Sequence, residues 1–314
     1  MKIGIILSAV IVVILVVVML VATKVSVDER TSYSGPKTLV AQNFSKLPAL
    51  MDLPAGDASA IYDEMISFYN QNSTALDALE SVSVELEEKA LDLIIKAAET
   101  GTVTAKYLDS KVPMVPNAVP DFKGAFQILA VVAMTRAKDL HDEKGNAAKQ
   151  ERAIKGGKAT FVLGHELFQK SNRLAVRNMG ISIMMTSGEM LFQWAAEGDT
   201  LAKNLLLWTD AINQLNEHWR PKHEVVYSLR LKTADMRATV GDLIAIAELD
   251  QDLSWRVEAT LALGRAKFMP GSGPDNRAGI LAALTKLVAD KEPLVADAAK
   301  VAEAFTKEDV KKMN

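Results

Sequence analysis

Residues 121–170 read DFKGAFQILAVVAMTRAKDLHDEKGNAAKQERAIKGGKATFVLGHELFQK, and this stretch decides the fold. Apolar side chains in its first part, residues 121–143, recur at helical spacing: Phe122, Phe126, Leu129, Ala133 and Ala137. A turn at Lys144, Gly145 and Asn146 interrupts the pattern, and a second helix is expected over residues 147–170. Two long helices joined by so short a turn predict a helical hairpin.

The sequence before this hairpin predicts another pair of helices. The first starts at Asp57, a favourable N-cap, and the second covers residues 74–99 and stops at Gly101. Both carry a single apolar stripe, formed in the first helix by Ile61, Met65 and Phe68, and in the second by Leu76, Leu79, Val82, Leu86, Ala90, Leu93 and Ala97.

Two further helices are predicted over residues 172–197 and 199–219. The second places its large apolar residues on one stripe: Leu201, Leu205, Trp208, Ile212, Leu215 and Trp219. Pro221 is expected to end it, because proline has no backbone N–H, and all ten prolines are interpreted as breaks between helices. Beyond residue 22 no stretch combines alternating polarity, β-branched residues and hairpin turns, so the predicted fold class is all-α.

Residues 235–305 contain an internal repeat. Residues 237–240 match 277–280 at an offset of 40, and residues 252–257 match 290–295 at an offset of 38. Each copy is a helix, an acidic turn and an alanine-rich second helix. This pattern resembles HEAT repeats, and the small residues after the turn in the 121–170 pair loosely resemble a tetratricopeptide repeat. The resemblance implies an α-solenoid-like array of helical hairpins with a surface for a protein partner.

The N-terminal residues 3–22, IGIILSAVIVVILVVVMLVA, contain no charge. As a helix they would span about 30 Å, the thickness of a bilayer's hydrocarbon core, so a single transmembrane anchor is predicted. A cleaved signal peptide is the alternative, but the apolar run is long for one, and residues 20–24 lack a clean cleavage site.

The predicted organisation is an anchor (residues 1–23), a stalk (24–56), a tetratricopeptide-like helical-hairpin domain (57–220) and HEAT-like repeats (221–314). We expect the stalk, which is too apolar for a free linker, to lie against the domain in extended or one-turn pieces. Basic residues after the anchor favour a cytoplasmic domain, whereas the very short N-terminal tail favours export. An extracytoplasmic domain on the periplasmic side is expected, and the cytoplasmic orientation stays open.

Composition excludes several kinds of chemistry. The chain has no cysteine, which rules out disulfides, thiolate nucleophiles and cysteine metal sites. Its 36 basic and 39 acidic residues give a net charge of −3, with both signs interspersed along the chain. Nucleic-acid binding therefore has no electrostatic support.

The candidate chemical groups each have a structural interpretation. They are the histidines His141, His165, His218 and His223, the methionines Met179, Met184, Met185 and Met190, the pair Gly156 and Gly157, and the acids Glu85, Glu87 and Glu88. A metal site at His218 and His223 is disfavoured because Pro221 is expected to break the helix between them. The methionines fit core packing, with a pliable binding groove as the alternative. The glycine pair lacks the preceding strand of a phosphate loop, and the acids fit a solvated face.

We therefore assign no catalytic, cofactor-binding or metal-ligating residue from the sequence. The favoured function is a membrane-anchored helical-repeat scaffold or accessory subunit of a membrane or envelope complex, held in the membrane by residues 3–22 and binding a protein partner. No small-molecule substrate is indicated. The alternative is a membrane-anchored enzyme, such as a carboxylate-based hydrolase, whose active residues are dispersed over the helices.

Overall fold

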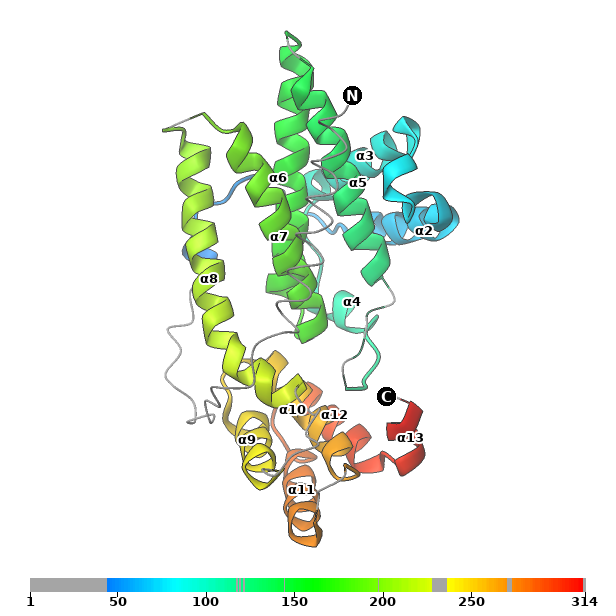
Figure 1. Ribbon diagram of the computed structural model, residues 1–314, viewed down its shortest axis with the longest axis vertical. Coiled ribbons are helices and arrows are strands. Elements are labelled where there is room, and N and C mark those ends of the chain that lie inside the picture. The colour runs from blue at the N-terminus through cyan, green and yellow to red at the C-terminus, as the bar shows by residue number, and fades with distance from the viewer. Residues whose placement is uncertain are drawn as a thin grey trace. The chain divides into compact units, whose positions relative to one another are not determined.

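The computed structural model describes residues 44–116, 118, 120, 122–143, 145–196, 198–227, 236–269 and 273–312. Within these ranges every regular element is a helix and no strand is formed, which confirms the all-α fold class (Figure 1). The predicted anchor at residues 3–22 lies outside them. Among the helices that are described, none combines the length and the apolar character needed to cross a bilayer.

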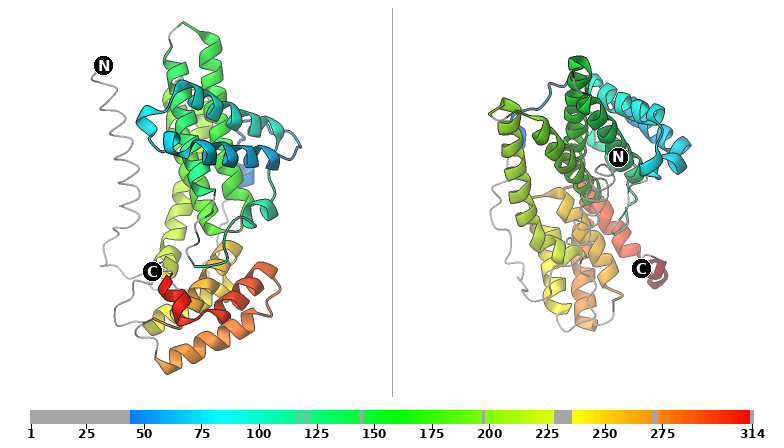
Figure 2. Two further views of the ribbon diagram at one scale, coloured as in Figure 1. Left: turned by 90° about the vertical axis from the view of Figure 1, so that its right-hand side faces the viewer. Right: turned by 45° about the horizontal axis from the view of Figure 1, so that its top comes forward.

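The α-helices are α2 (Ser59–Leu76), α3 (Val84–Thr100), α4 (Ala105–Asp109), α5 (Lys123–Asp142), α6 (Ala147–Lys170), α7 (Leu174–Trp194), α8 (Thr200–Tyr227), α9 (Met236–Leu249), α10 (Leu253–Ala266), α11 (Pro274–Leu287), α12 (Pro293–Ala304) and α13 (Lys307–Lys312), with 3-10 turns η1 (Phe44–Lys46) and η2 (Leu79–Ser81). Consecutive helices pack as neighbouring pairs, and α5, α6 and α7 lie side by side in the views of Figures 1 and 2. The apolar core of the N-terminal helices, from α2 to α7, lies between α2, α3, α5, α6 and α7.

The α5–α6 hairpin agrees with the sequence prediction. Gly145 has φ +82°, a conformation that glycine adopts without strain. The side chain of Asn146 then accepts a hydrogen bond from the backbone N–H of Lys149 and caps α6. The second helix has the predicted bounds, whereas the first begins at Lys123 rather than at residue 121.

The predicted continuous helix over residues 74–99 is wrong, because the chain breaks between α2 and α3. Leu79 is forced to φ +31°, and Ser83 caps the new helix by accepting a hydrogen bond from the N–H of Leu86. The break lets α2 fold back onto α3, where Glu64 pairs with Lys89 and Lys96. Gly101, with φ +138°, ends α3 as expected.

Two glycines bring α6 and α7 into close contact. A Cβ atom on Gly164 would lie 2.7 Å from the backbone oxygen of Gly180, and one on Gly180 would lie 2.4 Å from the backbone oxygen of Gly164. Such distances are shorter than any tolerated carbon–oxygen contact, so only glycine fits at both positions. The two helices therefore pack with their backbones nearly touching.

The expectation that Pro221 ends its helix is wrong, since α8 continues through it to Tyr227. An interior proline leaves the carbonyl four residues earlier without its helical donor, at a typical cost of about 3 kcal/mol. Beyond the proline, Val225 and Val226 are buried, and burial of their apolar side chains offsets this cost. The predicted domain boundary at 220/221 consequently falls inside α8.

Helix α10 is enclosed by its neighbours. Every residue from Ser254 to Ala266 is buried, and α10 contacts α7, α8, α9, α11 and α12 (Figure 2). A Cβ atom on Gly264 would lie 2.7 Å from Ala302 of α12, so a glycine is needed at this crossing.

In the two C-terminal helix pairs, the aspartate turns and the starts of the second helices are offset by 40 residues, whereas α9 and α11 begin and end 38 residues apart. Asp250 accepts a hydrogen bond from the N–H two residues later, and Asp290 does the same. Helices α10 and α12 then begin three residues after these aspartates. The offset of 38 inferred for the second helices is therefore wrong, because it matched Asp252, the N-cap of α10, with Asp290, which lies two residues before the N-cap of α12.

Candidate functional site

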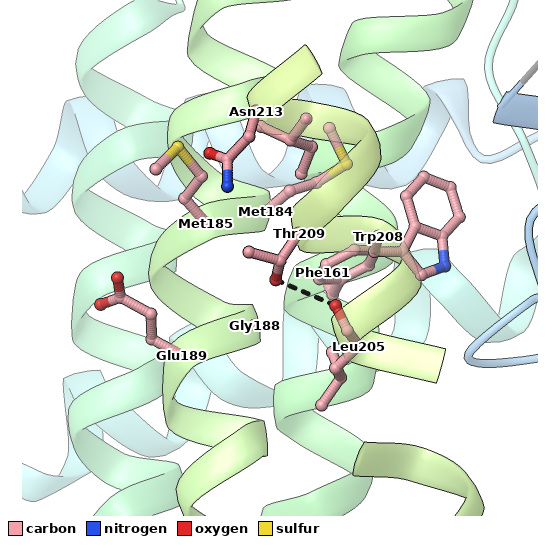
Figure 3. Close-up of a pocket in the computed structure, with 10 residues that line it drawn as sticks. Phe161, Met184, Met185, Gly188, Glu189, Leu205, Trp208, Thr209 and Asn213 are labelled. Carbon is pink, nitrogen blue, oxygen red and sulfur yellow. Dashed lines mark hydrogen bonds between the residues drawn. The ribbon is translucent and has the colours of Figure 1, made fainter. Parts of the chain in front are cut away.

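A groove lies between α7 and α8 and encloses about 350 Å³ of space open to solvent (Figure 3). It is lined by Phe161 of α6, by Met184, Met185, Gly188 and Glu189 of α7, and by Leu205, Trp208, Thr209, Ile212 and Asn213 of α8. Most of these side chains are apolar, so the groove suits an apolar ligand surface better than a small polar molecule.

The floor of the groove is formed by buried side chains. Trp208 meets the Phe161 ring edge-on, with the ring centroids 5.3 Å apart. Met184 and Ile212 complete the floor and are also buried. Gly188 has no side chain, which keeps the α7 wall low; a Cβ atom there would lie at ordinary contact distance, 3.4 Å, from Phe161. The groove therefore exists because bulky side chains, rather than paired glycines, separate α7 from α8.

The rim combines a methionine with polar groups. Met185 and Glu189 project from α7, and Thr209 and Asn213 from α8 (Figure 3). Thr209 is already satisfied, since its hydroxyl donates to the Leu205 carbonyl at 2.9 Å. The exposed Glu189 forms no ion pair with any residue that the structure describes. Its carboxylate is free to meet a cation on a ligand.

Exposed apolar side chains extend the groove along both helices. Phe192 follows Met185 by seven residues and Leu206 precedes Asn213 by seven, so each shares a helix face with a rim residue. Their exposed fractions are 45% and 56%. Large apolar side chains left in water next to an apolar groove are typical of a binding surface.

The far side of Trp208 is covered by the stalk. We call residues 44–53 the strap. Phe44 begins a single 3-10 turn and is buried between Phe168 and Trp208, at centroid distances of 4.9 and 5.8 Å. The Trp208 indole N–H donates to the Pro48 carbonyl at 2.8 Å. For its described part, the stalk thus lies against the helices in a one-turn piece, as expected.

The histidines have structural environments. His165 lies edge-on to Trp208 at 4.9 Å, and its Nε2 is buried without a hydrogen-bond partner among the described residues. Burial, with a smaller contribution from the Lys170 charge, lowers the pKa of His165 to about 4. His141 stacks on Trp194 at 4.8 Å. Neither histidine faces a carboxylate across a cavity.

His218 and His223 both lie on the continuous helix α8. Five residues correspond to a rotation of about 140°, so the two rings point to different sides even though Pro221 does not end the helix. Burial lowers the pKa of His218 and lowers that of His223 to about 4, and the His223 ring packs on Tyr227 at 4.3 Å. The described residues contain no group of three histidines or carboxylates that could hold a metal ion.

The interpretation of the acidic cluster as a solvated face is wrong for two of its three members. Glu87 is buried, and burial raises its pKa, with the Asp139 charge adding to the effect. Glu88 is half-buried and pairs with Arg136 and Arg152, which fastens α3 to α5 and α6. Only Glu85 is exposed. Glu88 thus has structural partners, and none of the three carboxylates lines the groove.

Gly156 and Gly157 allow close helix contacts. A Cβ atom on Gly156 would lie 2.4 Å from the Leu91 side chain of α3, and one on Gly157 would lie 2.7 Å from Leu191 of α7. The glycine pair therefore lets α6 approach two neighbours at once.

The four methionines divide between the two interpretations. Met179 and Met184 are buried, as core packing predicts, but Met184 also forms part of the groove floor. Met185 is half-buried on the rim, and Met190 is half-buried farther along α7. The sequence missed the groove itself, although large apolar residues outside the buried stripes, such as Leu206 and Phe192, could have indicated it.

Charged side chains between α7, α8 and α10 form a second cluster that the sequence did not reveal. Arg173 is fully buried and donates to the carbonyls of Val112 and Pro113 at 3.0 Å. A terminal nitrogen of Arg173 lies 3.5 Å from Oε1 of Glu258, which is also buried. This cluster fixes helices to one another and has no cavity beside it among the described pockets.

Comparison with protein-family models, with curated proteins and with solved structures gives no match for this chain.

Proposed function

We propose that the protein is a membrane-anchored interaction module that binds an amphipathic helix of a partner protein in the groove between α7 and α8. The observation that carries the proposal is the apolar groove floor, with Met185 on its rim and the exposed Phe192 and Leu206 on the same helix faces as rim residues. An amphipathic helix buries one apolar face in such a groove. Methionine side chains adapt their shape to the ligand, which suits this role.

The dimensions of the groove define the partner segment. The part of α8 that lines the groove, from Leu205 to Asn213, is about 12 Å long, which matches about two turns of a bound helix. Apolar residues at i, i+3 or i+4, and i+7 would fill the floor. A lysine or arginine beside this stripe would meet Glu189, whose carboxylate has no described ion-pair partner.

The helical pairs on either side of the groove support the same class of function. Their resemblance to tetratricopeptide and HEAT repeats favours a solenoid-like scaffold, because such arrays use their surfaces to bind proteins. The anchor at residues 3–22 would place this scaffold at a membrane, with the helices on the extracytoplasmic side. Labelling an engineered surface cysteine in intact cells with a membrane-impermeant maleimide tests that orientation, since the chain has no other thiol.

Site-specific crosslinking tests the groove. A photoreactive amino acid replaces Leu206 or Phe192 in the full-length protein in its membrane, and Val84 of α3, with an exposed fraction of 57%, serves as the matched control. We expect one partner segment to crosslink at both groove positions and not at Val84. The crosslinked segment must show the apolar spacing and the basic residue described above.

A charge swap then tests the contact with Glu189. A synthetic peptide of the mapped segment should bind Glu189→Lys more weakly, and reversing the charge of the peptide's basic residue should restore binding. Equal crosslinking at all three positions, or a segment without an amphipathic pattern, would overturn the proposal and make the hydrolase alternative the one to screen.

A further inference from the structure

We infer that docking of the strap and occupancy of the groove are positively coupled through Trp208, so that the strap regulates the binding surface. This inference rests on the function proposed above for the groove. In the sequence the strap lies between the predicted anchor and α2, and it contacts α6 and α8 through Phe44 and Pro48.

Trp208 belongs to both sites at once. One side of its ring lines the groove floor beside Phe161. Its indole N–H donates to the Pro48 carbonyl at 2.8 Å, and Phe44 lies against it at 5.8 Å. The ring is a rigid plane with two rotatable bonds, and the strap supplies two of its partners, while Phe161 and His165 supply the others.

Undocking of the strap would leave this ring unsupported. The indole N–H, whose bond to Pro48 is part-buried, would lose its protein acceptor and would need water to replace it. Phe44 would also leave a space between Phe168 and Trp208. Rotation of Trp208 toward water or into this space relieves both penalties and removes part of the groove floor. A ligand that needs the floor therefore stabilises the docked strap, and the docked strap strengthens ligand binding by the same factor.

Thiol labelling of the full-length protein in detergent micelles tests the coupling without a partner. Because the chain has no cysteine, Ile212→Cys places a single reporter in the buried floor, and Ile280→Cys places the same substitution in buried α11 as a control. The probe is a maleimide in excess. We expect Phe44→Ala to raise the labelling rate of Cys at 212 by tenfold or more and to leave that at 280 unchanged, with Phe44→Leu intermediate.

Fluorescence shows whether the strap has undocked. The emission of Trp208, obtained as the difference between each protein and its Trp208→Phe variant, should shift to longer wavelength in Phe44→Ala. Such a shift without faster labelling at 212 would overturn the inference, as would equal acceleration at 212 and 280, which reports general loosening. Failure of the proposed function is distinguishable, since it removes the crosslinks at Leu206 and Phe192 while the labelling difference persists.

Discussion

The ammonium nitrogen of Lys222 lies 2.7 Å from a carboxylate oxygen of Asp250, and both side chains are almost fully buried. This ion pair joins the last turn of α8 to the loop between α9 and α10. It can form only because α8 continues past Pro221, which would otherwise release Lys222 from the interior.

Removing one partner of this pair should be strongly destabilising. We expect Lys222→Met to lower the free energy of unfolding by about 3 kcal/mol or more, because Asp250 then stays buried beside no ammonium group. The double variant Lys222→Met, Asp250→Asn should recover part of this loss, since an asparagine oxygen can still accept the N–H of Asp252. Urea unfolding of the full chain in detergent, followed by circular dichroism, measures both. A single variant as stable as the parent would contradict the buried pair.

Arginine should be required at position 177. One terminal nitrogen of Arg177 lies 2.7 and 2.8 Å from the two carboxylate oxygens of Asp252, and the guanidinium lies over the rings of Phe168 and Trp219 at 4.7 and 5.0 Å. Lysine lacks the flat group that stacks on two rings, so Arg177→Lys should cost about 1–2 kcal/mol. Lys300→Arg on the exposed face of α12 is the control, and thermal unfolding should show no comparable loss there.

Two glycine-to-alanine substitutions should act in opposite directions. Gly180→Ala forces a methyl group into the α6 backbone and should lower stability by more than 2 kcal/mol. Gly241 lies inside α9 with no atom within 4 Å of its missing Cβ, so Gly241→Ala should raise stability by about 0.5–1 kcal/mol. Denaturant midpoints measure both changes. Equal effects at the two sites would contradict the close packing of α6 on α7.

Mild acid should destabilise the fold through His165. Its pKa is about 4 in the folded protein, against an ordinary value of 6.5, so between these pH values the unfolded chain binds a proton that the folded chain does not. Stability therefore falls as the pH falls from about 6.5 to about 4, by about 3 kcal/mol at most for this group.

The variant His165→Asn isolates this effect from other buried groups. Burial raises the pKa of Glu166, so this group makes stability rise as the pH falls. The effect of His165 is therefore read from the difference between parent and variant at each pH. Unfolding free energies at pH 7 and pH 4.5 should differ less in the variant. The same difference in both proteins would mean that His165 is not held neutral by burial.

Local sequence signals predicted much of the fold. The bounds of α6 follow from Gly145 and Asn146, and the end of α3 follows from Gly101, because both ends depend on backbone conformations or caps that the local sequence specifies. The break before α3 was missed because it requires a leucine, Leu79, at positive φ, which no residue preference indicates. The continuation of α8 was missed because tertiary burial of Val225 and Val226 outweighs the local effect of Pro221.

The groove could not be derived from the same signals. Periodicity identifies Trp208 and Ile212 as inward-facing. It does not show whether α8 packs directly against the neighbouring helix there or leaves a groove between the two. That spacing depends on Gly188 and on which side chains meet across α7 and α8, and such pairings appear only in three dimensions. The strap contact with Trp208 joins positions 160 residues apart, beyond any local pattern.

Because α10 is enclosed by helices that follow it in the sequence, its packing is completed only after those helices have been synthesised. A chain still being synthesised that has emerged only as far as Ala266 has no α11 or α12, so the alanines and Gly264 that will meet α12 remain wet. The Lys267 ammonium group likewise cannot donate its hydrogen bonds to the carbonyls of Ala302 and Glu303 until these residues, 35 and 36 positions later, have been synthesised. A chain that ends before α12 would therefore leave these α12-facing residues of α10 in contact with water.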